Sequence, residues 1–139
     1  MEIADARKRI LATIERSKQR AAERRARADE ASRAYSSFLE EIAIPLFRQA
    51  ANVLKVEGYP FGLFTPAGSV KLVSDRNPQD AIEMLFDSSG DRPLVMGHTT
   101  RSRGGRVVES ERPVGDPASL SEADVLDFLA RELEPFVER

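Results

Sequence analysis

A cluster of arginines beside a Gly-Gly pair is the strongest candidate for chemistry in this sequence of 139 residues. Its members fall on one alternating phase of two extended segments, and they are Arg101, Arg103, Arg106 and Arg112. A guanidinium group can bind a carboxylate or a phosphate through two parallel hydrogen bonds. Like charges opposed on a strand ladder repel, and a bound anion would relieve that repulsion. We therefore predict an anion-binding or partner-binding surface here; the alternative is an exposed hairpin end that serves only solubility.

His98 is the second candidate, because it is the only histidine and has one specific neighbour. The expected strand pairing places it opposite Glu111, and a carboxylate beside an imidazole favours the charged imidazolium. The two could titrate as a pair. The alternative, a partly buried structural histidine at the edge of the core, is the more common role for such a residue.

Catalysis, metals and cofactors have little support in the sequence. There is no cysteine and no spacing typical of a metal site. The glycines at 104–105 lie between two strands rather than before a helix, so they do not form a phosphate-binding loop. Surfaces that stack nucleic-acid bases carry aromatic side chains, and none lies between these arginines. We expect no catalytic residue, no metal ligand and no cofactor, and we do not favour nucleic acid as the partner; an enzyme that uses His98 is the weakest alternative.

The arginines depend on a hairpin whose turn is Gly104-Gly105. Two glycines accept the positive φ angles that a two-residue primed turn requires, and such a turn sets the register of residues 92–103 against residues 106–114. The expected pairs are Arg103 with Arg106, Arg101 with Val108, Thr100 with Glu109 and His98 with Glu111. Leu94, Met96 and His98 then share one face. We assign that face to the core because it carries Leu94 and Met96, so the arginine face should meet solvent.

The preceding chain alternates with a period of two, which predicts three more strands at residues 59–65, 69–75 and 80–87. A final helix begins at Ser121, an N-cap with Asp124 three residues later. The expected core consists of Phe47, Leu54, Phe61, Leu63, Leu72, Ile82, Met84, Phe86, Met96, Phe128, Leu129 and Leu133.

Residues 2–43 contain neither Gly nor Pro and predict one long helix. Apolar residues recur on it every three or four positions, and the expected oligomer seam is Ile3, Ile10, Ile14, Tyr35, Phe38 and Ile42. The helix residues expected to pack on the sheet are Phe38, Ile42, Phe47 and Leu54. A single helix of this length cannot cover its stripe on so small a domain, so we expect it to pair with a second copy. Pro45 should kink or break the helix near residues 42–44, and Gly58 should end it.

Taken together, the patterns predict an α+β fold with a long, coiled-coil-like, Pro-kinked N-terminal helix, a five-stranded antiparallel meander, and a C-terminal helix packed on the sheet. Residues 1–44 should form an oligomerisation stalk and residues 45–139 a head. The chain has a net charge of −2, no apolar signal-peptide segment at its N-terminus and no cysteine. These features predict a cytoplasmic protein. We expect a non-enzymatic homo-oligomer, a dimer or higher, that contacts an unidentified partner protein through its head and does not enter the membrane. The alternative is a binder of a phosphate-bearing ligand or nucleic acid through the arginine-rich hairpin tip.

Overall fold

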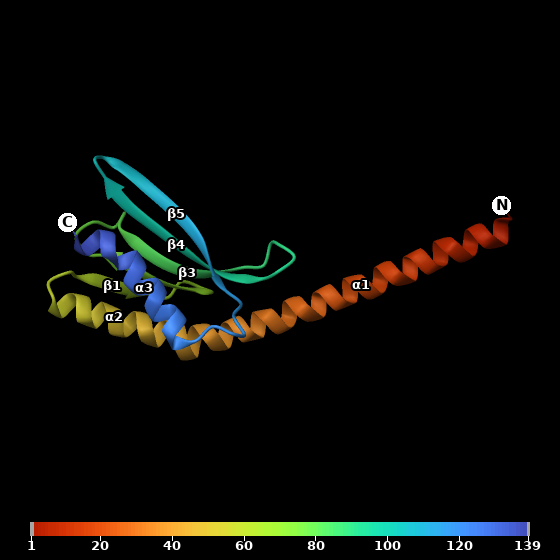
Figure 1. The fold of residues 1–139 in the computed structure, drawn as a ribbon, viewed down its shortest axis with the longest axis horizontal. Helices are drawn as coiled ribbons and strands as arrows, with labels where there is room; N and C mark the ends of the chain where they lie inside the picture. The colour runs from red at the N-terminus through yellow and green to blue at the C-terminus, as the bar shows by residue number, and fades with distance from the viewer. Residues whose placement is uncertain (1, 139) are drawn as a thin grey trace.

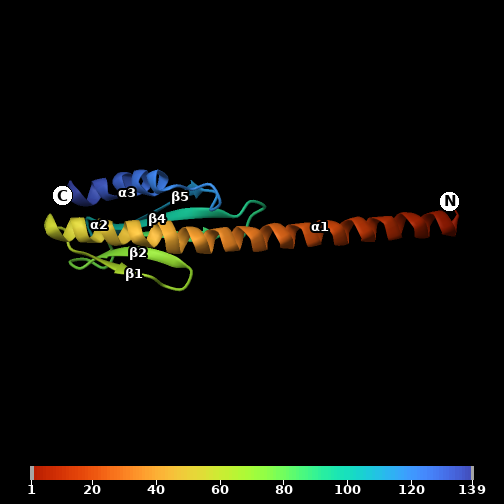
Figure 2. The same ribbon diagram turned by 90° about the horizontal axis from the view of Figure 1, so that it is seen from below.

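The computed structural model describes residues 2–138 and consists of a compact head with one helix projecting far beyond it (Figures 1 and 2). The element order is a long helix, five strands and a closing helix. We call residues 3–30 of the first helix the rod and residues 35–138 the head. The predicted α+β fold is confirmed.

The first helix is continuous from Ile3 to Val56 and has three parts. An α-helix, α1 (Ile3–Phe38), leads into one π-helical turn, Leu39–Ala43, and then into α2 (Ile44–Val56). Pro45 does not break it. The amide of Ile44 donates to the carbonyl of Leu39, five residues back, so the wider turn lies directly before the proline that lacks a donor. The helix axis bends in this region (Figure 1).

The sheet is an antiparallel meander with the strand order β1-β2-β3-β4-β5. Its strands are β1 (Phe61–Phe64), β2 (Ser69–Ser74), β3 (Ala81–Asp87), β4 (Leu94–Arg103) and β5 (Arg106–Gly115). The predicted meander is confirmed. Helix α3 (Glu122–Val137) follows, and Ser121 and Asp124 form the expected capping box at its start.

The helices lie on one face of the sheet, and the core fills the space between the two layers. Leu72, Ile82 and Met84 are fully buried on the sheet side, and Phe47 and Val125 are fully buried on the helix side. Of the core residues predicted from the sequence, Leu63, Phe86 and Leu133 are half-buried at the edge of this cluster. The prediction that Met96 belongs to the core is wrong, because Met96 lies on the opposite face of the sheet.

The core also takes in the end of α1, which we had expected to belong to the stalk. Tyr35 and Phe38 are buried, and the ring of Tyr35 stacks on Phe86 with centroids 4.7 Å apart. The Tyr35 hydroxyl donates a 2.6 Å hydrogen bond to the carbonyl of Gly68 in the β1–β2 turn. The packing of the head therefore begins at Tyr35, before the expected boundary at residue 44.

Within residues 2–138, no helix has the length and apolar content needed to cross a membrane.

Candidate functional site

The hairpin β4–β5 has the register that its glycines predict. Gly104 and Gly105 have φ angles of 58° and 78°, and Arg103 pairs with Arg106 across the turn. The pairs Arg101 with Val108, Thr100 with Glu109, and His98 with Glu111 are also present. The four arginines therefore do share one face of the hairpin.

That face, however, is the one that looks toward the helices, so our assignment of the opposite face to the core was wrong. Arg103, Arg106 and Arg112 are nevertheless exposed to solvent. The buried residues of β4 are Val95, Gly97 and Thr99, and they share their phase with Arg101. Leu94, Met96 and His98 lie on the opposite face, where each is half-buried.

The reason for this inversion is the packing of α3 against β4. A Cβ atom on Gly97 would overlap the ring of Phe128, so only glycine lets that ring approach the strand. Two positions further along β4, Thr99 is also buried, and its hydroxyl donates a hydrogen bond to Glu132 of α3. Apart from Val95, the core face of β4 thus consists of a glycine and a threonine, and neither contributes an apolar side chain that the sequence could reveal.

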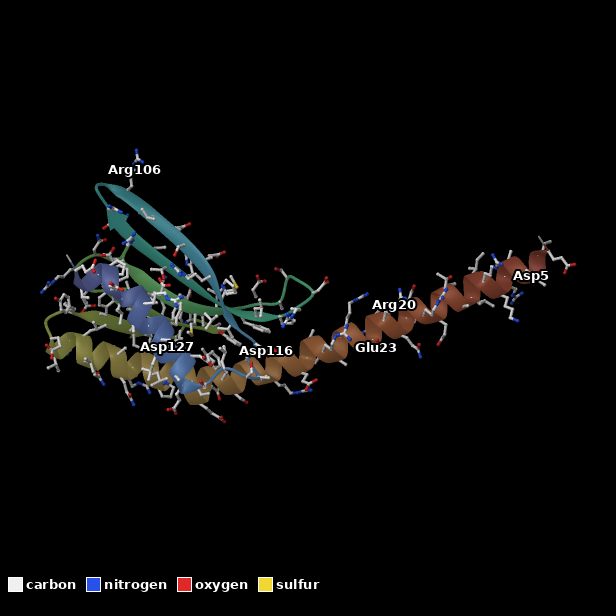
Figure 3. The ribbon with its side chains drawn as sticks, in the orientation of Figure 1. Asp5, Arg20, Glu23, Arg106, Asp116 and Asp127 are labelled. Carbon is white, nitrogen blue, oxygen red and sulfur yellow. The ribbon has the colours of Figure 1, made fainter. Side chains whose placement is uncertain are left out.

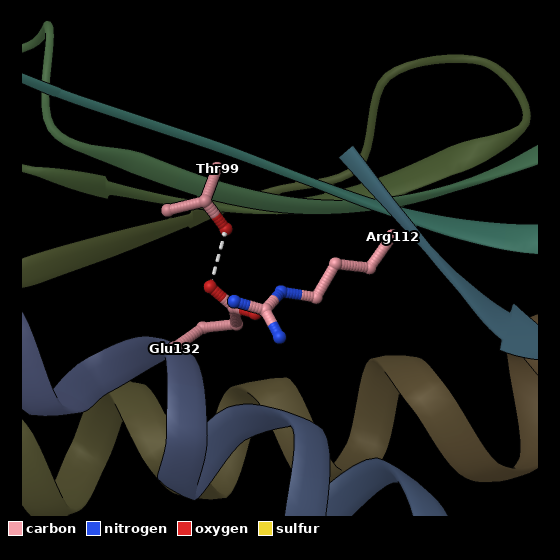
Figure 4. Close-up of polar contacts among 3 residues, drawn as sticks. All are labelled: Thr99, Arg112 and Glu132. Atoms are coloured by element: carbon pink, nitrogen blue, oxygen red, sulfur yellow. Dashed lines mark hydrogen bonds and ion pairs between the residues drawn. The ribbon is translucent and has the colours of Figure 1, made fainter. Parts of the chain in front are cut away.

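Glu132 is the centre of the polar contacts between α3 and the hairpin (Figure 4). Its side chain points from α3 toward the sheet, and the residue is only 6% exposed. Oε2 accepts a 3.1 Å hydrogen bond from Oγ1 of Thr99, and Oε1 lies 3.2 Å from Nε of Arg112 in an ion pair that lacks hydrogen-bond geometry. A buried carboxylate is thereby neutralised by an arginine whose own side chain remains about half exposed, at 51%.

These contacts form one wall of a cleft of about 200 Å³ between α3 and the hairpin. Its lining residues are Thr99, Arg101, Val108, Ser110, Arg112, Arg131, Glu132 and Pro135. Three guanidinium groups and one carboxylate meet there, which leaves an excess of positive charge and two hydroxyls. Such a cleft can hold a small anionic group.

The other two predicted arginines lie away from this cleft. Arg103 and Arg106 are exposed on either side of the turn, and Arg106 points away from the head at the hairpin tip (Figure 3). The predicted cluster is thus divided into a cleft pair, Arg101 and Arg112, and a tip pair, Arg103 and Arg106.

His98 lies on the face of the sheet opposite the helices. The register places Glu111 on one side of it and Glu83 on the other, and Lys71 follows next to Glu83. A second carboxylate neighbour from β3 was not expected from the sequence. Glu83 is itself held by Ser69, whose hydroxyl donates a 2.9 Å hydrogen bond to Oε2.

The expected oligomer seam is also divided. Tyr35 and Phe38 are buried in the head, and Ile42 packs against its core. These three residues are therefore unavailable to a second helix. Ile3, Ile10 and Ile14 remain on the rod with 89%, 60% and 44% of their surface exposed, and Leu11, which we had not included, is 53% exposed.

Three residues of the cleft were missed in the sequence: Thr99, Arg131 and Glu132. A signal for Glu132 was present, because it continues the stripe of Val125, Phe128 and Leu129 at helical spacing. A charged residue within a buried stripe needs a partner, which points to a contact across the layers. Thr99 and Arg131 carried no such signal.

Within residues 2–138, no group of three or more His, Cys, Asp or Glu side chains could hold a metal ion. Comparison of the chain with protein-family models, with curated proteins and with solved structures gives no match.

Proposed function

We propose that this protein is a non-enzymatic, oligomeric interaction protein of the cytoplasm, which self-associates through the rod and presents its head to a partner protein. The observation that carries this proposal is the exposed apolar stripe of the rod. Ile3, Ile10, Leu11 and Ile14 lie on a segment that projects beyond the sheet and α3 in both views (Figures 1 and 2). Exposed apolar surface of this kind on a helix is typical of a protein–protein contact.

The energetics support pairing of rods. Burying an isoleucine or leucine side chain fully contributes about 1.5–3 kcal/mol, and a pair of rods brings two sets of these residues together. The remainder of the stripe consists mainly of small residues, Ser17, Ala21 and Ala28, which allow two helix backbones to approach closely.

Light scattering after size-exclusion chromatography tests the proposal. The double variant Ile10→Gln and Ile14→Gln keeps good helix formers but removes the stripe, so we expect it to be monomeric where the natural chain is a dimer or larger. The control is Lys8→Gln with Glu15→Gln, on the outer side of the rod, which leaves the net charge unchanged and should leave the mass unchanged. A natural chain that is monomeric at several hundred micromolar would contradict self-association.

A second candidate function is recognition of a phosphate-bearing ligand, and the cleft between α3 and the hairpin favours it. Arg101, Arg112 and Arg131 meet there, while Glu132 offsets only one positive charge. We propose binding through the cleft pair, with the tip pair adding a longer-range attraction.

Retention on heparin at rising salt tests this second candidate. Arg101→Gln should elute earlier than the natural chain and reduce the dependence of binding on salt, because each phosphate contact contributes to that dependence. Arg48→Gln on the exposed side of α2 is the control and should change retention little. Equal retention of both variants would remove support for the cleft as a phosphate site.

A further inference from the structure

We propose that the rod pairs with the rod of a second copy in the antiparallel orientation, so that the two heads lie at opposite ends of the dimer. This inference rests on the proposed self-association and adds its geometry. Three features of the rod and its junction with the head lead to it: the sizes of the seam residues, the positions of the charges and a groove where the rod meets the head.

The sizes of the seam residues are unevenly distributed along the rod. Its first half carries the large residues Ile3, Ile10 and Ile14, and its second half carries the small residues Ser17, Ala21 and Ala28 on the same stripe. In a parallel pair each residue faces its own copy, so the isoleucines would pack together in one half and the other half, with its small residues, would be loosely filled. Well-packed interfaces instead set large residues against small ones.

An antiparallel pair makes that match for all three isoleucines. When residue 14 of one rod lies beside residue 17 of the other, the sequence spacing also places residue 10 beside residue 21 and residue 3 beside residue 28. Each of the three isoleucines then faces an alanine or a serine of the second copy. Helices packed in this way can approach closely over residues 3–28.

The charges that flank the stripe favour the same orientation. They are concentrated in the second half of the rod, and they are Lys18, Arg20, Arg25 and Arg27. In a parallel pair Arg20 lies beside Arg25 of the second copy, on both sides of the interface, and the two repel. In the antiparallel pair each of these four cations lies beside an uncharged residue of the first half of the other rod. Lys18 lies beside Leu11, Arg20 beside Thr13, Arg25 beside Ala4 and Arg27 beside Ala6.

Two further arginines do not distinguish the orientations. Arg7 and Arg24 lie on the stripe itself. A parallel pair sets each beside its own copy, whereas an antiparallel pair sets Arg7 beside Arg24 twice, so the number of such contacts is the same.

The junction of rod and head provides a place for the end of the second rod. A groove of about 290 Å³ lies between Ala28 of α1 and the loop before β4, where Asp91 and Pro93 contribute to its wall. In the antiparallel pair Ile3 of the second copy arrives beside Ala28. The head thus ends the overlap where the matched residues end.

Cysteine cross-linking tests the orientation, because the natural chain contains no cysteine. Ile10→Cys and Ala21→Cys are made in separate chains, each chain is studied alone, and the two are then mixed under reducing conditions and oxidised. Residues can be bridged only when their Cα atoms lie within about 7 Å. We expect no disulfide in either chain alone, and a disulfide in roughly half of the dimers of the mixture, the share that random exchange makes mixed.

Each outcome has a definite meaning. A dimer in which Ile10→Cys forms disulfides with itself is parallel and overturns the inference while leaving self-association intact. A dimer without disulfides, in this pair and in the pair Ile3→Cys with Ala28→Cys, also overturns it. If light scattering shows that the natural chain is a monomer, this result contradicts the proposed function instead. Lys8→Cys, on the outer side of the rod, controls for disulfides formed by chance collisions.

Discussion

Glu132 links α3 to the hairpin through two bonds of different character. Thr99 donates a hydrogen bond to one oxygen from within the core, and Arg112 approaches the other from the edge of the cleft. Solvent reaches the guanidinium but hardly reaches the carboxylate, so the two members of the ion pair are not equivalent. Losing one should not have the same effect as losing the other.

We predict that Arg112→Ala destabilises the head more than Glu132→Gln does. The first change leaves a buried carboxylate with Thr99 as its remaining partner, at a cost of about 1–3 kcal/mol. The second leaves a neutral amide that can still accept from Thr99, while Arg112 turns to water, at a cost below about 1 kcal/mol. Urea unfolding of both variants measures the difference. The reverse order would show that the ion pair does not neutralise Glu132.

Tyr35 is a buried tyrosine that connects the end of α1 to the sheet. Burial, the larger cause, and the nearby charge of Glu83 together raise the pKa of its hydroxyl to about 12. In the unfolded chain the hydroxyl titrates at its ordinary value of 10.0. The unfolded state therefore loses this proton first, and the stability that depends on the neutral phenol is present below pH 10 and is lost as pH rises toward 12.

We predict that Tyr35→Phe reduces the loss of stability between pH 10 and pH 12, by an amount on the order of 2 kcal/mol. At neutral pH the same variant should be less stable by about 1 kcal/mol, because it lacks the hydrogen bond to Gly68. Denaturant unfolding across this pH range measures both effects. Tyr59→Phe is the control, and it should keep the steep decline of the natural chain.

At the scale of elements, the π-helical turn is what allows one helix to serve the head over two stretches. Tyr35 and Phe38 before the turn and Phe47 and Leu54 after it are all buried. In a regular α-helix the pair after the turn would be rotated away from its present direction by about 100°, the angle of one residue. The extra residue of the π turn removes that rotation, so both stretches face the sheet.

We predict that deletion of Glu41 together with Pro45→Ala yields a regular helix and a folded head. The deletion removes the extra residue, and the substitution restores the missing amide donor. Deletion of Arg48 in the Pro45→Ala background is the control, because it rotates Leu54 away from the core and should unfold the head. Thermal unfolding followed by circular dichroism distinguishes the two. Equal loss of structure in both would show that the turn has no role in alignment.

At the scale of the whole molecule, the rod and the head differ in how they are stabilised. The head has its own core, whereas the rod has an apolar stripe that its own chain leaves exposed. The stability of the rod should therefore depend on protein concentration, and that of the head should not.

We predict two separate unfolding transitions on heating. The natural chain has two tyrosines, Tyr35 and Tyr59, both in the head, and no tryptophan, so tyrosine fluorescence follows the head alone. Helix content measured at 222 nm also includes the rod. Each tenfold dilution should remove about 1.4 kcal/mol from a dimer of rods and lower the first transition, while the fluorescence midpoint stays constant. A fluorescence midpoint that also falls on dilution would mean that the head depends on the dimer.

What the sequence determined by itself was local. Gly104-Gly105 set the hairpin register, because a two-residue primed turn leaves one way to pair its strands. Ser121 and Asp124 marked the start of α3, because a capping box involves only neighbouring residues. The alternation of residues 59–87 predicted the first three strands, because a period of two is also a pattern of neighbouring residues.

Only the tertiary structure decided which face of β4 is buried and what the apolar stripe of the long helix packs against. A period of two tells which side chains of β4 share a face, but the choice of the buried face depended on Phe128 packing on Gly97 and on Thr99 donating to Glu132. Likewise, a stripe at helical spacing has the same form whether its partner is a second helix or its own sheet. The sequence therefore placed Tyr35 in the oligomer seam alone and Phe38 in both the seam and the contact with the sheet, whereas the structure buries both in the head. These choices involve residues far apart in the chain, and their packing energies are absent from any local pattern.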